Sequence, residues 1–300
     1  MRVTTATATA ATGFRLGDRL ADYRELAKPR LNFLVLVTTG VGYYMGVRYS
    51  MDWGRLLHTL IGTALTAAAA SALNQFAERR EDALMKRTAN RPLPQERLSP
   101  AEALVFGLVL AAAGLLWLLL AVNALTAGLG LFTLLSYVLI YTPMKRTTTL
   151  NTIVGAVPGA IPPVMGFTAV RNELSPEALG LFAILFLWQM PHFLAIAILY
   201  RDDYRRAGFK MLPVVDEDLS LSSRQIVVYC LALIPATLLV IPLRMAGGMY
   251  FAAAVTLGTA FLCFGARAAA TRSRLDCRRL FLASVLYLPL LLAFLMIDKR

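Results

Sequence analysis

Nine long blocks of apolar residues constrain this chain more than any other feature of its sequence. The blocks cover approximately residues 31–47, 56–76, 103–122, 124–141, 150–169, 178–199, 226–243, 248–266 and 280–297. A helix needs about 20 mainly apolar residues to cross the hydrocarbon core of a bilayer. The blocks lack the alternation of apolar and polar residues that marks a membrane β-barrel. The sequence therefore predicts an all-α integral membrane protein with nine transmembrane helices.

The composition supports this prediction and excludes one class of partner. Only 16% of the residues are charged and 58% are hydrophobic, whereas a soluble domain carries about 25% charged residues. The net charge of +12 could indicate nucleic-acid binding. Because the basic residues lie in connections between apolar blocks, we expect the lipid bilayer as the partner and no nucleic acid.

The basic residues are divided unequally between the two sides of the predicted membrane. Of the 30 Lys and Arg residues, 24 lie in the N-terminal segment and in connections on its side, and six lie on the other side. Loops on the cytoplasmic side carry the excess of Lys and Arg, so the N-terminus is expected in the cytoplasm. We expect a flexible tail over residues 1–24 and a single transmembrane domain over residues 25–300. A bacterial inner membrane fits the short N-terminal extension, with the mitochondrial inner membrane as the alternative.

Two long charged loops suggest an internal repeat. Residues 77–102 and 200–225 follow the second and sixth blocks, so the loops lie four helices apart. Repeats of this kind place a site at the interface between the halves, and we therefore expect the helices to surround a central cavity. The fifth block is interrupted by several Gly and Pro residues between Gly155 and Gly166. It is either kinked for packing or broken where it lines the cavity.

Asn74, Glu78 and Asp82 form the strongest candidate site. They are spaced four residues apart at the end of the second block, and this spacing places three oxygen-bearing side chains on one helix face. Amide and carboxylate oxygens suit Mg²⁺, which could hold a diphosphate. The alternative is a solvated helix end that forms salt bridges.

Basic residues near this face could bind the phosphate oxygens. Arg87 and Arg91 follow it, and Lys145 and Arg146 lie in a short connection between the fourth and fifth blocks. Arginine binds phosphate oxygens in bidentate fashion and lysine acts as a point charge. The alternatives are the general excess of cytoplasmic cations and an interfacial anchor.

Two further elements are candidates in the second half. Asp202 and Asp203 follow the sixth block, where they would complete a site with two carboxylate clusters. His192 lies inside the sixth block next to Pro191, and an ionisable group within a membrane helix is a functional candidate. The alternative for His192 is a structural hydrogen bond to a neighbouring helix.

These motifs resemble the UbiA-type intramembrane prenyltransferases. The resemblance is carried by the NxxxExxxD pattern followed by MKRTANRPLP. It extends over Lys28–Arg30, Tyr141–Asn151, Gly159–Pro163, Trp188–Phe193 and Arg201–Pro213. In form these segments are similar to the protoheme IX farnesyltransferase, or heme O synthase, subgroup. One departure is that Tyr200 and Tyr204 occupy the ends of the second motif, where the family commonly has acids. The resemblance therefore does not imply direct metal binding by this second cluster.

The resemblance implies an activity and a set of roles. Heme B, farnesyl diphosphate and water would give heme O and diphosphate, with Mg²⁺ on Asn74, Glu78 and Asp82 and with His192 binding heme. It also implies heme A synthase or terminal oxidase assembly proteins as partners. Two alternatives stay open, namely a prenyltransferase with a quinone or chlorin acceptor and a membrane transporter with repeat architecture.

Overall fold

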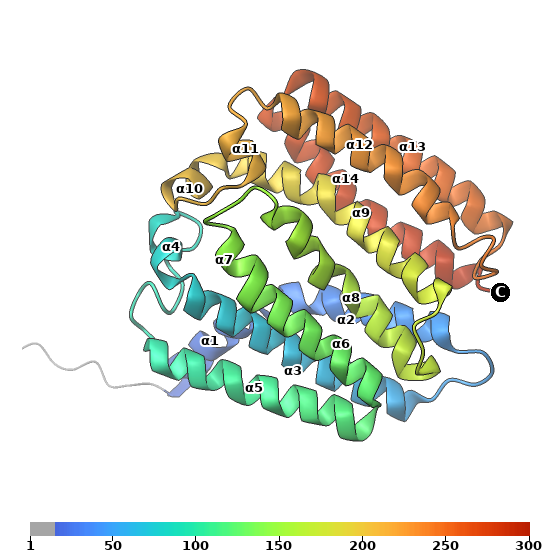
Figure 1. Cartoon of the computed structure of the whole chain (residues 1–300), viewed down its shortest axis with the longest axis horizontal. Coiled ribbons are helices and arrows are strands. Elements are labelled where there is room, and N and C mark those ends of the chain that lie inside the picture. The colour runs from blue at the N-terminus through green and yellow to red at the C-terminus, as the bar shows by residue number, and fades with distance from the viewer. Residues whose placement is uncertain (1–15) are drawn as a thin grey trace, which may run out of the picture.

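A computed structural model describes residues 16–300, which form helices and no named strand (Figure 1). The elements are α1 (Leu16–Ala27), α2 (Pro29–Gly46), α3 (Trp53–Ala77), α4 (Arg79–Leu84), α5 (Pro100–Ala121), α6 (Ala124–Leu135), the π-helix η1 (Ser136–Tyr141), α7 (Thr142–Met144), α8 (Asn151–Arg171), α9 (Pro176–Leu199), α10 (Arg201–Arg206), α11 (Leu212–Val215), α12 (Ser220–Leu238), α13 (Gly248–Thr271) and α14 (Arg274–Ile297).

All nine apolar blocks fall on helices of the described chain. Eight segments are long and apolar enough to cross a membrane, and α6, η1 and α7 together form one of them, Ala124–Met144. The first block is α2, which has 18 residues. Its first turn contains Pro29, Arg30 and Asn32, so its apolar stretch is shorter than that of the other spans. The predicted all-α membrane architecture is confirmed, with eight clear spans and α2 as a shorter ninth helix.

Helix α8 lies in the middle of the molecule, between α9 and α12–α14 on one side and α2, α3, α5 and α6 on the other (Figure 1). In its most apolar window 72% of the residues are buried, against 28–56% for the other spans. Three prolines lie inside α8, yet the helix is continuous from Asn151 to Arg171. Of the two alternatives for this segment, the broken helix is therefore absent, and the glycines and prolines serve close packing.

Two glycines allow α2 and α8 to cross in backbone contact. A Cβ added at Gly42 would lie 1.9 Å from the carbonyl oxygen of Pro163, and one added at Gly166 would lie 1.9 Å from that of Thr39. Small residues at such positions let membrane helices approach closely. This crossing fixes the position of α2, whose first turn adjoins the charged end of the molecule.

The first described helix corrects one expectation from the sequence. Residues 1–15 lie outside the described part of the chain, but Leu16–Ala27 form α1, so the predicted flexible tail over residues 1–24 is wrong from Leu16 onward. The Nε2 group of Gln75 donates to the carbonyl oxygen of Leu26 at 2.9 Å, and Leu26 is fully buried. Helix α1 is thus anchored against α3.

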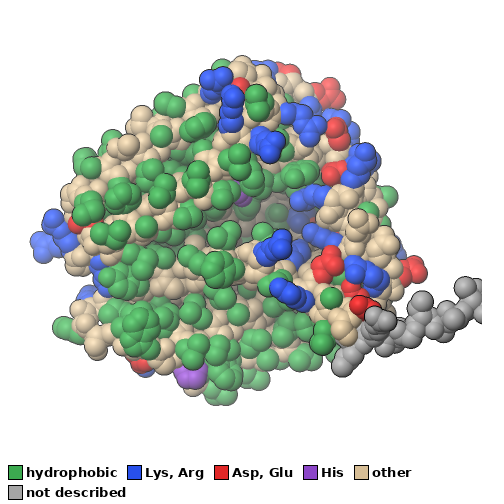
Figure 2. Space-filling view, turned by 180° about the vertical axis from the view of Figure 1, so that it is seen from behind, with side chains coloured by type: hydrophobic (Ala, Val, Ile, Leu, Met, Phe, Trp, Pro, Cys, Tyr) green, Lys and Arg blue, Asp and Glu red, His purple; other side chains and the backbone are tan. Residues whose placement is uncertain are grey.

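The charged side chains gather at the two ends of the molecule, and hydrophobic side chains cover the face between them (Figure 2). At the more highly charged end, the short helices α4 and α10 lie next to each other (Figure 1). The backbone N–H of Lys86 donates to Asp203 Oδ1 at 3.4 Å, and Arg206 Nε donates to the carbonyl oxygen of Leu84 at 3.4 Å. The loops of the two halves therefore meet at one end of the bundle.

Candidate active site

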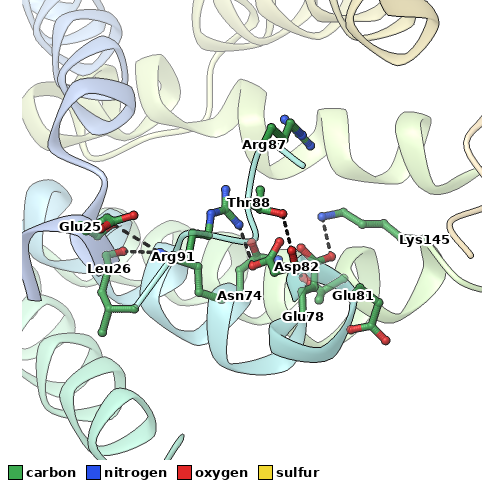
Figure 3. Close-up of polar contacts among 12 residues, drawn as sticks. Glu25, Leu26, Asn74, Glu78, Glu81, Asp82, Arg87, Thr88, Arg91 and Lys145 are labelled. Carbon is green, nitrogen blue, oxygen red and sulfur yellow. Dashed lines mark hydrogen bonds and ion pairs between the residues drawn. The ribbon is translucent and has the colours of Figure 1, made fainter. Parts of the chain in front are cut away.

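Asn74, Glu78 and Asp82 share one face at this end, as their spacing requires (Figure 3). Helix α3 ends at Ala77, but the backbone continues through Glu78 into α4. The N–H of Glu78 donates to the carbonyl of Asn74 at 2.9 Å, and the N–H of Asp82 donates to the carbonyl of Glu78 at 2.8 Å. The three residues are 3%, 4% and 1% exposed, so their side chains point into the protein and not into lipid.

The amide of Asn74 is oriented by Thr142. The hydroxyl of Thr142 donates to the carbonyl oxygen of Tyr137 at 2.8 Å, so it accepts the hydrogen bond from Asn74 Nδ2 at 3.1 Å. With its Nδ2 held there, Asn74 directs its Oδ1 acceptor away from Thr142. Tyr137 lies in the π-helix η1 and Thr142 directly follows it, and π-helices are often found at functional sites.

Asp82 is bonded through one carboxylate oxygen only. Its Oδ2 accepts from Arg91 Nη1 at 2.7 Å (Figure 3), and its backbone carbonyl accepts from the Thr88 hydroxyl at 2.8 Å. Its Oδ1 is buried and has no hydrogen-bond partner in the described part of the chain. A buried carboxylate oxygen without a partner is costly, and a bound cation would remove that cost.

Glu78 forms an ion pair with Lys145 across the site. The Lys145 Nζ lies 2.6 Å from Glu78 Oε1, and the two side chains are 12% and 5% exposed. Burial, the largest single influence, lowers the pKa of Lys145, but the Glu78 carboxylate together with Tyr137 and Tyr204 raises the pKa above its ordinary value. The Lys145 ammonium also lies 4.6 Å from the centre of the Tyr141 ring. Lys145 is therefore held charged at the edge of the acidic face.

The donor set of this face fits a divalent cation that also binds a phosphate. Across residues 16–300 no group of three or more His, Cys, Asp and Glu side chains is arranged as a metal site. Mg²⁺ commonly uses only one or two carboxylates, with waters and substrate phosphates as its other ligands. The amide oxygen of Asn74 and the carboxylates of Glu78 and Asp82, of which Asp82 Oδ1 is unpartnered in the described part of the chain, meet this requirement.

Arg87 and Arg91 differ in their surroundings. Arg91 reaches Asp82, whereas Arg87 donates to the Tyr204 hydroxyl at 2.9 Å. The guanidinium of Arg87 lies 5.0 Å from the ring centre of Tyr204 and 5.2 Å from that of Tyr200. The two tyrosines that replace the acids of the second motif thus hold an arginine of the first loop.

The structure places Arg146 away from the acidic face, and its expected role in binding diphosphate stays a prediction. Its guanidinium pairs with Glu81 at 2.7 Å and donates to the carbonyl of Ala77 at 3.1 Å. Figure 3 shows that Glu81 points away from Glu78 and Asp82. The neighbouring cations Lys145 and Arg146 therefore pair with different carboxylates, Glu78 and Glu81.

Asp202 and Asp203 are separated for the same reason. Asp203 is buried and holds Arg206 and the backbone of Lys86. The side chain of Asp202 is 70% exposed and lies 3.6 Å from Arg205. The structure therefore does not bring Asp202 to the acidic face, where the sequence predicted it, and Asp203 braces the loop that carries Arg87 and Arg91.

His192 lies on α9 and faces α14. Its Nδ1 is 2.7 Å from Ser284 Oγ, and the Ser284 hydroxyl donates its proton to the carbonyl of Phe281 at 2.6 Å. Nδ1 must therefore donate, which leaves the lone pair on Nε2. No described group hydrogen-bonds Nε2. The Trp188 ring stacks on the imidazole at 5.1 Å between ring centres.

Lys28 joins the site although the sequence did not single it out as a site residue. It connects α1 to α2 in the left-handed region, with φ of 48°. Strained backbone of this kind clusters at functional sites. Burial, followed by the charge of Arg91, lowers the pKa of Lys28 to about 7. Lys28, Arg91 and Arg24 also line a cavity of about 770 Å³ between α1 and α2. Only the Lys28–Arg30 motif could have drawn attention to this position.

The sequence comparisons agree with this architecture. The profile of the UbiA prenyltransferase family matches residues 35–294. A protoheme IX farnesyltransferase of Solibacter usitatus is 50% identical, over 93% of this chain and 99% of its own length. A protoheme IX farnesyltransferase of Myxococcus xanthus is 49% identical over 93% and 95%. The bacterial inner membrane expected from the sequence agrees with these relatives.

Solved structures share the fold. A structure described as digeranylgeranylglyceryl phosphate synthase superposes with a TM-score of 0.76 at 15% identity, covering 94% of this chain and 98% of that one. A UbiA homolog from Archaeoglobus fulgidus, bound to GPP and Mg²⁺, superposes with a TM-score of 0.61 at 16% identity, covering 91% and 99%. This chain is therefore a membrane-embedded enzyme that belongs to the UbiA prenyltransferase family.

Proposed function

We propose that this enzyme transfers a farnesyl group from farnesyl diphosphate to a vinyl group of heme B. Water adds to the product, which is heme O, and diphosphate is released. The observation that carries the proposal is the buried face of Asn74, Glu78 and Asp82 between the cations Arg91 and Lys145. Heme is proposed as the acceptor because the relatives that are 40–50% identical are named protoheme IX farnesyltransferase.

The first step is cleavage of the allylic carbon–oxygen bond of farnesyl diphosphate. The bonding electron pair leaves with the diphosphate, so negative charge grows on its oxygens. Arg91, Lys145 and Lys28 carry the positive charge that stabilises it, and such preorganised groups act strongly where water is excluded. Asn74, Glu78 and Asp82 would hold Mg²⁺, which would supply further positive charge to the leaving group.

The second step joins the farnesyl carbon to the acceptor. The terminal vinyl carbon of heme bonds to the allylic carbon, and water then adds to the neighbouring carbon and loses a proton. The carbocation must meet the vinyl group before it meets water. The apolar helices around the site exclude water, and His192 would position the porphyrin through its free Nε2, since neutral imidazole ligates heme iron.

Ser284 has a positioning role in this proposal. By accepting from Nδ1, it selects the imidazole tautomer with the lone pair on Nε2. Histidine ligands to metals commonly donate their other ring N–H to a fixed acceptor. Trp188, on α9 like His192, donates from its Nε1 to the backbone carbonyl of Ser284 at 2.9 Å. This bond helps to keep Ser284 next to His192.

The test is a reaction with purified protein in detergent, farnesyl diphosphate, heme B and Mg²⁺, followed by pigment extraction and mass spectrometry. The expected product carries the mass of heme B plus a farnesyl group and a hydroxyl group. A panel with quinone and chlorin acceptors tests the alternative acceptors. If one of them is prenylated and heme is not, the acceptor assignment is wrong.

The same reaction tests the transporter alternative. Ionisable groups of transporters lie near the bilayer midplane, whereas the acidic face lies where α3 passes into α4, at one end of the bundle. Diphosphate release in detergent, with no membrane gradient, supports an enzyme. Heme A synthase and terminal oxidase assembly proteins remain proposed partners, to be sought by affinity purification with the tagged protein.

A further inference from the structure

The end of the molecule remote from the acidic face carries few cations, and they are concentrated. Six of the 30 Lys and Arg residues belong to the connections at that end. Five of the six line one cavity of about 630 Å³, namely Arg48, Arg171, Arg244, Lys299 and Arg300. They come from the α2–α3 and α12–α13 connections, the last residue of α8 and the segment after α14. Segments distant in sequence thus converge on one positively charged pocket.

Lys299 has a structural role in this pocket. Its ammonium donates to the carbonyls of Tyr44 and Val47 at 2.5 and 2.6 Å, at the C-terminus of α2. A cation satisfies the free carbonyls at a helix C-terminus and complements the helix dipole. The four arginines remain to be explained.

The arginines are poorly neutralised by the protein. In the described part of the chain the Arg244 and Arg300 side chains form no hydrogen bond or ion pair with another residue. Arg171 has Glu173 at 3.7 Å, but its buried Nε has no hydrogen-bond partner in residues 16–300. Among the residues that line the cavity, Glu177 is the one acid. The pocket therefore retains positive charge and donors for an anion.

The walls of the pocket are apolar on the side of the helices. Met45, Phe167 and Met245 are buried there, at 7%, 2% and 5% exposure, while Ile297 at the rim is 69% exposed. The pocket lies where α2, α8 and α14 end, at the level where a bilayer meets water. Its charged opening and apolar wall match a molecule with an anionic headgroup and a hydrocarbon tail.

We infer that this pocket binds the phosphate headgroup of an anionic membrane lipid. Arginine forks suit phosphate oxygens, and the apolar wall formed by Met45, Phe167 and Met245 suits the hydrocarbon tail of the same molecule. The site is separate from the proposed chemistry, because the 25 residues of α3 place roughly 37 Å between the two ends of the bundle at 1.5 Å per residue. An anionic lipid here would tie together the ends of both halves of the fold.

The test is native mass spectrometry of the purified full chain in detergent. The probes are short-chain phosphatidylglycerol and phosphatidylcholine with identical tails, and inorganic phosphate as a competitor. The expected result is about tenfold tighter binding of phosphatidylglycerol, the effect of one or two additional charge-assisted contacts. The Arg48→Gln/Arg244→Gln variant should lose this preference.

The matched control is Arg55→Gln, because Arg55 lies at the same end but outside the pocket, 3.9 Å from Asp52. It should bind both lipids as the unmodified protein does. Should the double variant fold poorly, Arg300→Gln is the second variant, because its side chain is exposed. It should lower the preference for phosphatidylglycerol over phosphatidylcholine at least twofold. Equal binding of the two lipids, or an unchanged double variant, overturns the inference. Displacement of phosphatidylglycerol by equimolar inorganic phosphate also overturns it, because the site would then bind the free anion.

Discussion

Replacing Asp82 with asparagine tests whether Asp82 binds the metal or only forms an ion pair with Arg91. Asp82→Asn keeps the shape of a side chain that is 1% exposed but removes its charge, which faces Arg91 at 2.7 Å. Breaking a buried ion pair on one side costs about 3–5 kcal/mol. Because Arg91 is 22% exposed and can still donate to the amide oxygen, we expect a smaller loss of about 1–3 kcal/mol. The variant should therefore insert and fold.

The effect on catalysis should be larger than the effect on folding. Loss of one preorganised group at a site of developing charge lowers kcat by about 10²–10³, or roughly 2.7–4 kcal/mol. Asp82 also presents the unpartnered Oδ1, so Asp82→Asn should raise the Mg²⁺ concentration needed for half-maximal rate. Rates are measured as diphosphate release over a Mg²⁺ titration at fixed farnesyl diphosphate.

Arg91→Gln is the control variant, because it removes the same ion pair and leaves the Asp82 carboxylate in place. If Asp82 serves only to hold Arg91, the two variants should share one Mg²⁺ dependence, and the double variant should be no worse than either. If Asp82 binds the metal, Arg91→Gln should weaken the binding of farnesyl diphosphate at saturating Mg²⁺. It should leave the Mg²⁺ concentration for half-maximal rate, the Mg²⁺ midpoint, nearly unchanged. An Asp82→Asn enzyme with the parental Mg²⁺ midpoint would refute the metal role.

Three further changes test the other parts of the site. Ser284→Ala and His192→Ala should both weaken heme binding in absorbance titrations, with farnesyl diphosphate affinity retained; unaltered heme spectra would remove His192 from the site. At pH 8 Lys28 is mostly uncharged because its pKa is about 7, and an arriving diphosphate raises that pKa. Binding should therefore take up protons in calorimetry with buffers of different ionisation enthalpy, and Lys28→Met should abolish the uptake. Asp202→Ala should keep near-parental activity because its side chain is 70% exposed, while Asp203→Ala should lower activity about tenfold or more by freeing the loop of Arg87; equal activities would show that the brace is dispensable.

The sequence predicted those features that depend on periodicity within one helix. Apolar length located the spans, and the spacing of four residues placed Asn74, Glu78 and Asp82 on one face even though α3 ends at Ala77. A backbone that keeps its i to i−4 hydrogen bonds preserves the face, whatever the boundary between helices.

The features that the sequence did not predict depend on contacts between segments. Lys145 and Arg146 are neighbours in sequence, and only the fold shows that one pairs with Glu78 and the other with Glu81. Lys28 became part of the site through the turn between α1 and α2, which no periodic pattern encodes. The arginine pocket at the far end is the same case, because its members come from four separate segments.

Gly166 gives a stability test of the helix crossing on which the site depends. A Cβ at Gly166 would lie 1.9 Å from the carbonyl oxygen of Thr39 and 2.6 Å from the backbone nitrogen of Tyr43. Because backbone cannot rotate away, Gly166→Ala must push α2 from α8, and overpacking of this kind costs about 1–3 kcal/mol or more. The matched control is Gly128→Ala in α6, where an added Cβ meets nothing within 4 Å and alanine should gain about 0.5–1 kcal/mol. Thermal unfolding in detergent should therefore shift in opposite directions for the two variants. Since the displaced α2 begins immediately after Lys28, Gly166→Ala should also weaken farnesyl diphosphate binding, and a variant with parental stability and affinity would show that the crossing does not set the site.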